Sequence, residues 1–412
     1  MPAARPDDVA AAPPVPAVAA GTPARLAWLD ALRGLGALAV VGEHLLTWAM
    51  PWLRPTSFNL GMYGVLVFFL VSGYIIPVSL ERRGDVRAFW ISRFFRLYPL
   101  YLLVIAVVLA LSFWLPVRRE VPRDASALAS HATMLLDVVG AGGVVNTMWT
   151  LSYEMVFYLL VAALFVAGVR VGRGALSVAF AAAAMAAGLV LSNAPLTGAW
   201  LSWVSLAVFG LGLTCVITGY FRTAAAVALG VMALTLLLTA SPTPWFGAAI
   251  LSVMFAGTAI HRWERGTGRL WPVAVAAILV ALTPVWALDA GWWWVRPPVW
   301  ITTMVLAAAT FAGGMLLRTR RVPALLVWLG VISYSLYLLH LPILTGVIAI
   351  TGDLRWAPAP LQIGISLLCL LLMLPASWLT YRYLERPMQS YARRLTTPHQ
   401  EKTAASSGTR AR

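Results

Sequence analysis

The chain has 412 residues, of which 61% are hydrophobic and only 11% are charged, and its mean hydropathy is +0.83. Soluble domains carry about 25% charged residues, so this composition excludes an ordinary soluble protein and indicates a multi-pass protein of the cell membrane. The net charge of +15 does not indicate nucleic-acid binding, because the arginines lie mostly in short loops between apolar runs, where they set membrane orientation.

Residues 27–390 are predicted to form one transmembrane domain between disordered tails at 1–26 and 391–412. The first tail lacks a basic start followed by an apolar core, so it is not predicted to be a cleaved signal peptide. We predict an all-α bundle of 10–12 transmembrane helices, with both termini cytoplasmic because arginines follow every even-numbered run. The candidate runs are 29–49, 60–80, 97–116, 149–169, 174–192, 199–217, 223–240, 243–260, 271–288, 299–317, 324–348 and 360–384.

The first run carries Arg33 and His44, eleven residues apart. Eleven steps of 100° return almost to the same helix face, and the rise is roughly 16 Å. Ionisable groups at that depth usually mark a site, and a pantetheine arm of similar length suggests a coenzyme A thioester along this helix. His44 suits a general base that takes a proton from a hydroxyl, although it could equally satisfy a neighbouring carbonyl. Glu43 points about 100° away from His44 and is a poor partner for it.

The segment ISRFFRLYPLY places Arg93 and Arg96 three residues apart, at the cytoplasmic mouth of the third run. If the segment is helical, both guanidinium groups lie on one face, where their forked geometry matches phosphate oxygens. The alternative is a cluster that only fixes membrane orientation, and the spacing alone favours that alternative.

The fourth run contains WTLSYEMVFYLL, with Glu154 about one and a half turns inside it. The alternating direction of the runs puts Glu154 in the outer half of the bilayer, as it does His44. A buried carboxylate needs a partner, so we predict that Glu154 shares a cavity with His44, where it orients the imidazole or binds the acceptor. A purely structural pairing is the alternative.

Three further features lie toward the carboxyl end. The tryptophans at 292–294 favour an interfacial belt over a sugar-binding platform. Tyr334, Tyr337 and His340 recur every three residues, which favours a structural polar stripe between helices. The tripeptide ERP at 385–387 is predicted to end the last span with an ion pair.

Six motifs together make the chain resemble the membrane-bound acyltransferase 3 family, and they run in the family's order over roughly residues 27–390. The resemblance implies transfer of an acyl group from cytoplasmic acyl-CoA to a hydroxyl, usually on a sugar. It also implies that His44 corresponds to the family's essential first-span histidine and Arg33 to its basic partner. The motifs are LDALRGLGALAVVGEHLL, FFLVSGYII, ISRFFRLYPLY, WTLSYEMVFYLL, SYSLYLLHLPI and the ERP ending.

By the same resemblance, Arg93 and Arg96 match the paired arginines linked to handling of the acyl donor. Glu154 matches the first acidic residue of the fourth-span motif. The chain departs from many members at Met155, where they carry a second glutamate. The WTLSYEM form is similar to that of stand-alone acyltransferases of exopolysaccharides, and related members acylate macrolide antibiotics.

We therefore expect an integral-membrane O-acyltransferase that uses acyl-CoA as co-substrate, with no bound cofactor and no metal. Its expected acceptor is a glycan or a glycosylated small molecule. The alternative from another class is a transporter or flippase of a lipid or small molecule, which the absence of an obvious internal repeat disfavours. A third possibility is a protein that only passes an acyl group to a partner enzyme.

Overall fold

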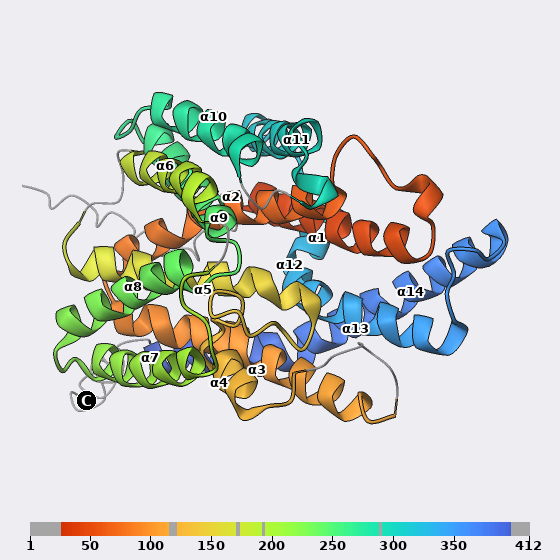
Figure 1. The fold of residues 1–412 in the computed structure, drawn as a ribbon, viewed down its shortest axis with the longest axis horizontal. Helices are drawn as coiled ribbons and strands as arrows, with labels where there is room; N and C mark the ends of the chain where they lie inside the picture. Colours follow the sequence, from red (N-terminus) through yellow and green to blue (C-terminus); the bar gives the residue numbers. More distant parts are fainter. Residues whose placement is uncertain (1–25, 115–121, 170–173, 192–193, 288–290, 397–412) are drawn as a thin grey trace, which may run out of the picture.

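The computed structural model describes residues 26–114, 122–169, 174–191, 194–287 and 291–396, which form helices and contain no strand (Figure 1). The all-α prediction is confirmed for this part of the chain. In chain order the elements are α1 (Ala27–Trp48), η1 (Pro51–Leu53), α2 (Leu60–Arg83), α3 (Val86–Leu111), α4 (Ala125–Thr133), η2 (Asn146–Met148), α5 (Trp149–Val166), α6 (Ala175–Val190), α7 (Trp200–Thr218), α8 (Arg222–Thr239), α9 (Pro244–Glu264), α10 (Trp271–Trp286), η3 (Trp293–Val295), α11 (Pro297–Leu316), α12 (Ala324–Val331), α13 (Ser333–Thr351), α14 (Ala359–Thr380), the π-helix η4 (Tyr381–Glu385) and α15 (Arg386–Thr396).

Nine helices in the described segments are long and apolar enough to cross a membrane, which identifies a multi-pass membrane protein. Helices α6 and α10 are apolar but shorter, with 16 residues each. Helix α1 is long but carries three charged residues, Asp30, Arg33 and Glu43. Each predicted run corresponds to a helix, except that the run at 324–348 is divided at Ile332 into α12 and α13.

Helices α1, α2 and α9 occupy the middle of the bundle (Figure 1). Helix α2 packs against α1, α9 and α11, and α9 also packs against α6 and α10. In α9, 94% of the apolar stretch is buried, more than in any other candidate span of the described chain. Within α1, Glu43 is buried and Asp30, Arg33 and His44 are partly buried, as ionisable groups in a membrane require.

The backbones of α1 and α12 touch at Gly34 and Gly330. A Cβ atom on Gly330 would lie 1.8 Å from the carbonyl oxygen of Asp30, and one on Gly34 would lie 2.3 Å from that of Leu326. Real Cβ atoms do not approach so closely, so only glycine fits this crossing. The crossing fixes the position of the α1 turn that carries Arg33.

A tight turn at Gly84 and Asp85 joins α2 to α3. Gly84 ends α2 in the left-handed conformation at φ 69°, which glycine adopts without steric conflict. Asp85 then caps α3, because its carboxylate accepts hydrogen bonds from the backbone N–H groups of Arg87 and Ala88. Helix α3 therefore starts eleven residues before the predicted run at 97–116, and both Arg93 and Arg96 lie on it.

The prediction that ERP ends the last span was wrong. The helix continues through η4 into α15, and the wider π-turn accommodates Pro387, which lacks an N–H and would clash with the preceding turn. Glu385 is buried and accepts a hydrogen bond from Ser335 instead of pairing with Arg386. The predicted disordered tail is thus helical through Thr396, and its remainder, like residues 1–25, lies outside the described residues.

Candidate active site

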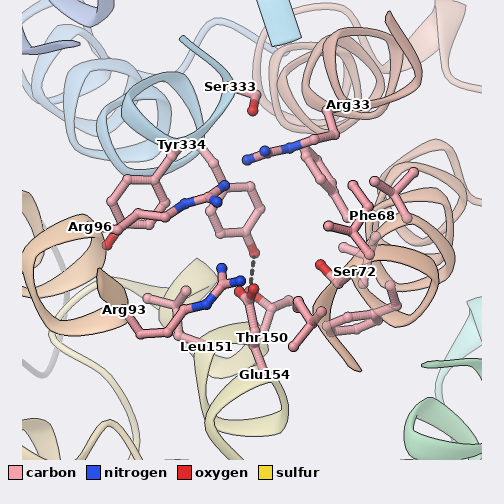
Figure 2. A pocket seen from close by; sticks show the side chains of 16 residues that line it. Arg33, Phe68, Ser72, Arg93, Arg96, Thr150, Leu151, Glu154, Ser333 and Tyr334 are labelled. Carbon is pink, nitrogen blue, oxygen red and sulfur yellow. Dashed lines mark hydrogen bonds between the residues drawn. The ribbon is translucent and has the colours of Figure 1, made fainter. Parts of the chain in front are cut away.

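Arg33, Arg93 and Arg96 point into one pocket, which we call the arginine pocket (Figure 2). Arg33 comes from α1, and the other two come from one face of α3. The remaining walls include Ser72 of α2 and Glu154 of α5. The pocket encloses about 100 Å³. Helix formation around Arg93 and Arg96 thus brings both guanidinium groups to one face, as their spacing predicted.

The arginine pocket carries more positive than negative charge. Glu154 is the acidic residue among its lining side chains, and it accepts a hydrogen bond from Tyr158. The Tyr158 ring in turn lies 5.1 Å from the guanidinium carbon of Arg93. None of the salt bridges found within the described segments involves the three arginines. A partly enclosed cluster of this kind favours an anionic ligand such as a phosphate.

His44 lines a second cavity of about 530 Å³, which we call the tryptophan cavity because Trp48, Trp149, Trp292 and Trp294 also line it. His44 is half-buried and makes no hydrogen bond to the described part of the protein. Its imidazole is therefore available to a ligand, as a general base must be.

Glu43 holds the loop between α1 and α2 at the rim of the tryptophan cavity. Its carboxylate accepts hydrogen bonds from Arg54 Nε at 2.9 Å, from Asn59 Nδ2 at 3.3 Å and from the Leu60 backbone N–H at 3.1 Å. Trp293 stacks on the same guanidinium, with 4.3 Å between the guanidinium carbon and the ring centroid. Glu43 is thus engaged with the loop and not with the neighbouring imidazole, as its direction on the helix predicted.

The two cavities meet at a partition formed by Val65, Phe68 and Tyr337. Val65 and Tyr337 line both cavities. The Tyr337 hydroxyl donates to the carbonyl oxygen of Thr147 at 2.8 Å, and it lies 2.7 Å from the Thr150 hydroxyl. Phe68 packs edge-on against the Tyr337 ring at 6.2 Å. Two hydrogen bonds and an aromatic contact therefore fix the side chain that separates the cavities.

The prediction that Glu154 shares a cavity with His44 was wrong. The partition crosses α5 at Thr150, which contacts Tyr337. Trp149 lies on the side of the tryptophan cavity, whereas Glu154, about one and a half turns further along the helix, lines the arginine pocket. The depth of Glu154 along its helix therefore places it beyond the partition, beside the arginines of α3.

His340, which the sequence indicated as part of a structural stripe, lies against His44. The two ring centroids are 5.1 Å apart. Nδ1 of His340 lies 3.1 Å from the carbonyl oxygen of Leu336, which can only accept, so the proton sits on Nδ1. Nε2 is then an acceptor, and it is buried without a hydrogen-bond partner in the described part of the chain. Tyr337 of the same stripe does form a hydrogen bond to another helix, at Thr147, as a structural polar stripe predicts.

Asp137 is a cavity residue that sequence reasoning missed. It lies in the loop before α5, lines the tryptophan cavity, and accepts a hydrogen bond from the Tyr153 hydroxyl at 2.7 Å. Burial raises the pKa of the Asp137 carboxyl, and the bond from Tyr153 partly offsets that rise. Nothing in the loop sequence marks this residue, because its place beside the cavity depends on how the loop folds back onto α5.

The model of a family described as "Acyltransferase domain" matches residues 26–382. The chain belongs to the acyltransferase 3 family. This acyltransferase 3 protein is 30% identical over 150 residues to the peptidoglycan O-acetyltransferase OatA of Listeria monocytogenes, a match that covers 32% of the chain and 23% of the relative. No solved structure matches the chain.

Two other bacterial relatives match a segment of similar length. The putative peptidoglycan O-acetyltransferase YrhL of Bacillus subtilis is 31% identical over 150 residues, which cover 32% of the chain and 22% of the relative. The O-acetyltransferase OatA of Staphylococcus aureus is 31% identical over 149 residues, which cover 32% of the chain and 24% of the relative. The acyltransferase 3 protein thus aligns with less than a quarter of the length of these relatives.

Proposed function

We propose that the protein is an O-acyltransferase that moves an acetyl or other short acyl group from acyl-CoA to a hydroxyl of a sugar-containing acceptor. One observation carries the proposal. Helix α1 contributes Arg33 to the arginine pocket and His44 to the tryptophan cavity, and the two cavities meet at Tyr337. A single helix thus connects a site suited to an anionic donor with a site that holds an available base.

In this proposal the arginine pocket binds the phosphates of acyl-CoA, which is a co-substrate and not a bound cofactor. Arg33, Arg93 and Arg96 supply the forked donors that phosphate oxygens accept. The pantetheine arm then follows α1 toward His44, over a rise of roughly 16 Å for eleven helical residues. We assign Glu154 to this donor site, where its contact with Tyr158 orients the ring that faces Arg93.

His44 acts as the general base in the proposed reaction. It takes the proton from the acceptor hydroxyl as the hydroxyl oxygen attacks the thioester carbonyl. The carbon–sulfur bond breaks, the CoA thiolate leaves, and the protonated His44 gives it the proton, which yields free CoA thiol and regenerates the base. The His340 ring packs against the His44 imidazole, with 5.1 Å between the ring centroids, and its Nε2 has no hydrogen-bond partner among the described residues.

The acceptor in this proposal is a hydroxylated glycan of the cell envelope or an exopolysaccharide. Two relatives are named as a peptidoglycan O-acetyltransferase and a putative one, which supports a glycan acceptor. A glycosylated macrolide is the other acceptor that the family resemblance implies.

The test uses purified full-length protein and acetyl-CoA with a radiolabelled acetyl group. We expect thioester consumption and a labelled product only when a glycan acceptor is present, and loss of both in His44→Ala. Transport of the acceptor across vesicles without thioester consumption would instead identify a transporter and overturn the proposal. Labelled protein without labelled product would indicate that the group passes to a partner enzyme.

A further inference from the structure

The wall of the tryptophan cavity is a continuous set of aromatic rings. Trp292 and Trp294 stack at 5.1 Å with 9° between their planes. Trp294 packs against Phe246 at 5.4 Å, and Phe246 packs against Trp149 at 5.6 Å. These four side chains all line the cavity. The tryptophans of this loop therefore do more than form a belt at the membrane surface, since two of them turn inward.

The segment before α5 supplies polar groups to the wall of the tryptophan cavity. Thr147 lines the cavity but is only 3% exposed, and its buried hydroxyl has no hydrogen-bond partner among the residues that the structure describes. Asn146 next to it is exposed to the cavity, and its side chain makes no hydrogen bond to the described residues. Asp137 presents a carboxylate that one hydrogen bond from Tyr153 leaves with spare acceptor capacity. Asn146 and Asp137 therefore leave an amide and a carboxylate at the cavity surface that are available to a polar ligand.

The presence of both aromatic and polar side chains distinguishes the tryptophan cavity from a lipid-binding groove. A separate groove between α2, α9, α10 and α11 is lined almost wholly by apolar side chains, with Ser252 and the Trp263 indole as its polar groups. That lining suits a hydrocarbon chain. The tryptophan cavity instead combines flat aromatic faces with carboxylate, amide and hydroxyl groups. A pyranose ring has the matching surfaces, because one face exposes C–H groups and its edge carries hydroxyls.

We propose that the tryptophan cavity binds one pyranose ring of the acceptor. The C–H face of the ring lies on the aromatic wall of Trp292, Trp294 and Trp149. Ring hydroxyls bond to Asp137 and to the Asn146–Thr147 segment, and the hydroxyl to be acylated faces His44. The inference rests on the proposed function for that last contact, whereas binding of the sugar itself does not require it.

The test measures binding of a β-1,4-linked N-acetylglucosamine tetrasaccharide to the full-length protein in detergent by saturation-transfer NMR. We expect transfer to the ring C–H protons, and an affinity at least tenfold weaker in Trp292→Ala and in Asp137→Asn. Asp137→Asn keeps an acceptor for the Tyr153 hydroxyl, so a loss of affinity in this variant reports on the contact with the sugar and not on the contact with Tyr153. The matched control is Trp286→Ala, because Trp286 is exposed at the end of α10 and does not line the cavity.

Two outcomes would overturn the inference: absence of binding to the unaltered protein, or an equal loss in the Trp286→Ala control. Thioester consumption by the same preparations separates this inference from the proposed function. Consumption with another acceptor but no tetrasaccharide binding leaves the function intact and removes the pyranose site. Tetrasaccharide binding without consumption under any condition keeps the site and removes the acyltransferase proposal.

Discussion

At the scale of single residues, His44 stands out because it lines a cavity and yet makes no hydrogen bond to the described protein. Replacing it with alanine should therefore leave folding intact while transfer falls by about 10²–10⁴, the contribution typical of a general base. Acyl transfer and size-exclusion behaviour in detergent measure the two effects. Near-normal turnover by a well-folded His44→Ala protein would remove this residue from catalysis.

Asp137 gives a prediction about pH. Because burial raises its pKa in the folded protein, the charged form opposes folding, and stability falls as pH rises through that pKa. Asp137→Asn removes the charge but keeps an acceptor for Tyr153. We expect a higher melting temperature than the unaltered protein at pH 7 and an equal one near pH 3. A variant that is less stable at pH 7 would contradict this account.

At the scale of elements, the register of α3 places Arg93 and Arg96 in the arginine pocket, which we propose to bind the acyl donor. Arg93→Ala combined with Arg96→Ala should raise the KM for acyl-CoA at least about tenfold, because each charge-assisted hydrogen bond is worth about 1.5–3 kcal/mol. The KM for the acceptor should stay within about twofold. Arg87→Ala is the matched control, since Arg87 is exposed nearly two turns earlier on the same helix. Equal loss for donor and acceptor would indicate a folding defect.

The contact between α1 and α12 yields a second prediction at this scale. Gly330→Ala should destabilise the protein by about 1–3 kcal/mol, because the added methyl overlaps the Asp30 carbonyl. It should also weaken acyl-CoA binding, since it displaces the turn of Arg33. Gly346→Ala on α13 is the control, because open space surrounds that position. Thermal unfolding in detergent provides the comparison, and equal melting temperatures would contradict the close crossing.

The sequence predicts the helices well because an apolar run of spanning length must pair its backbone internally. It also predicts that Arg93 and Arg96 share a face, since that follows from helical spacing alone. It fails for Glu154 because depth along a span does not reveal where Tyr337 of a distant helix closes the space. It fails for ERP because a π-turn accommodates the proline, and that turn has no pattern of its own.

At the scale of the whole molecule, the positive loops predict that the start of α3 faces the cytoplasm and the loop at 292–294 faces outward. In a protein with Cys215→Ser and Cys369→Ala, we expect Trp292→Cys to react with a membrane-impermeant maleimide in intact cells. Arg87→Cys should react only after the membrane is opened. Both side chains are exposed, so reactivity reports sidedness and not burial. Labelling of both positions from one side would contradict the predicted orientation.

The partition at Tyr337 also has a bioenergetic consequence. The two cavities meet at Tyr337, so they would join into one path if this side chain moved away. An open path for ions through an energised membrane would dissipate the membrane voltage. Each elementary charge that crosses 100 mV releases about 2.3 kcal/mol, so even a slow proton leak would drain the cell. Tyr337 is anchored by hydrogen bonds to α5 and its preceding turn, and we expect it to keep the two cavities separate. In the proposed reaction the acyl group passes Tyr337, and we expect the same residue to limit proton leakage between the cavities.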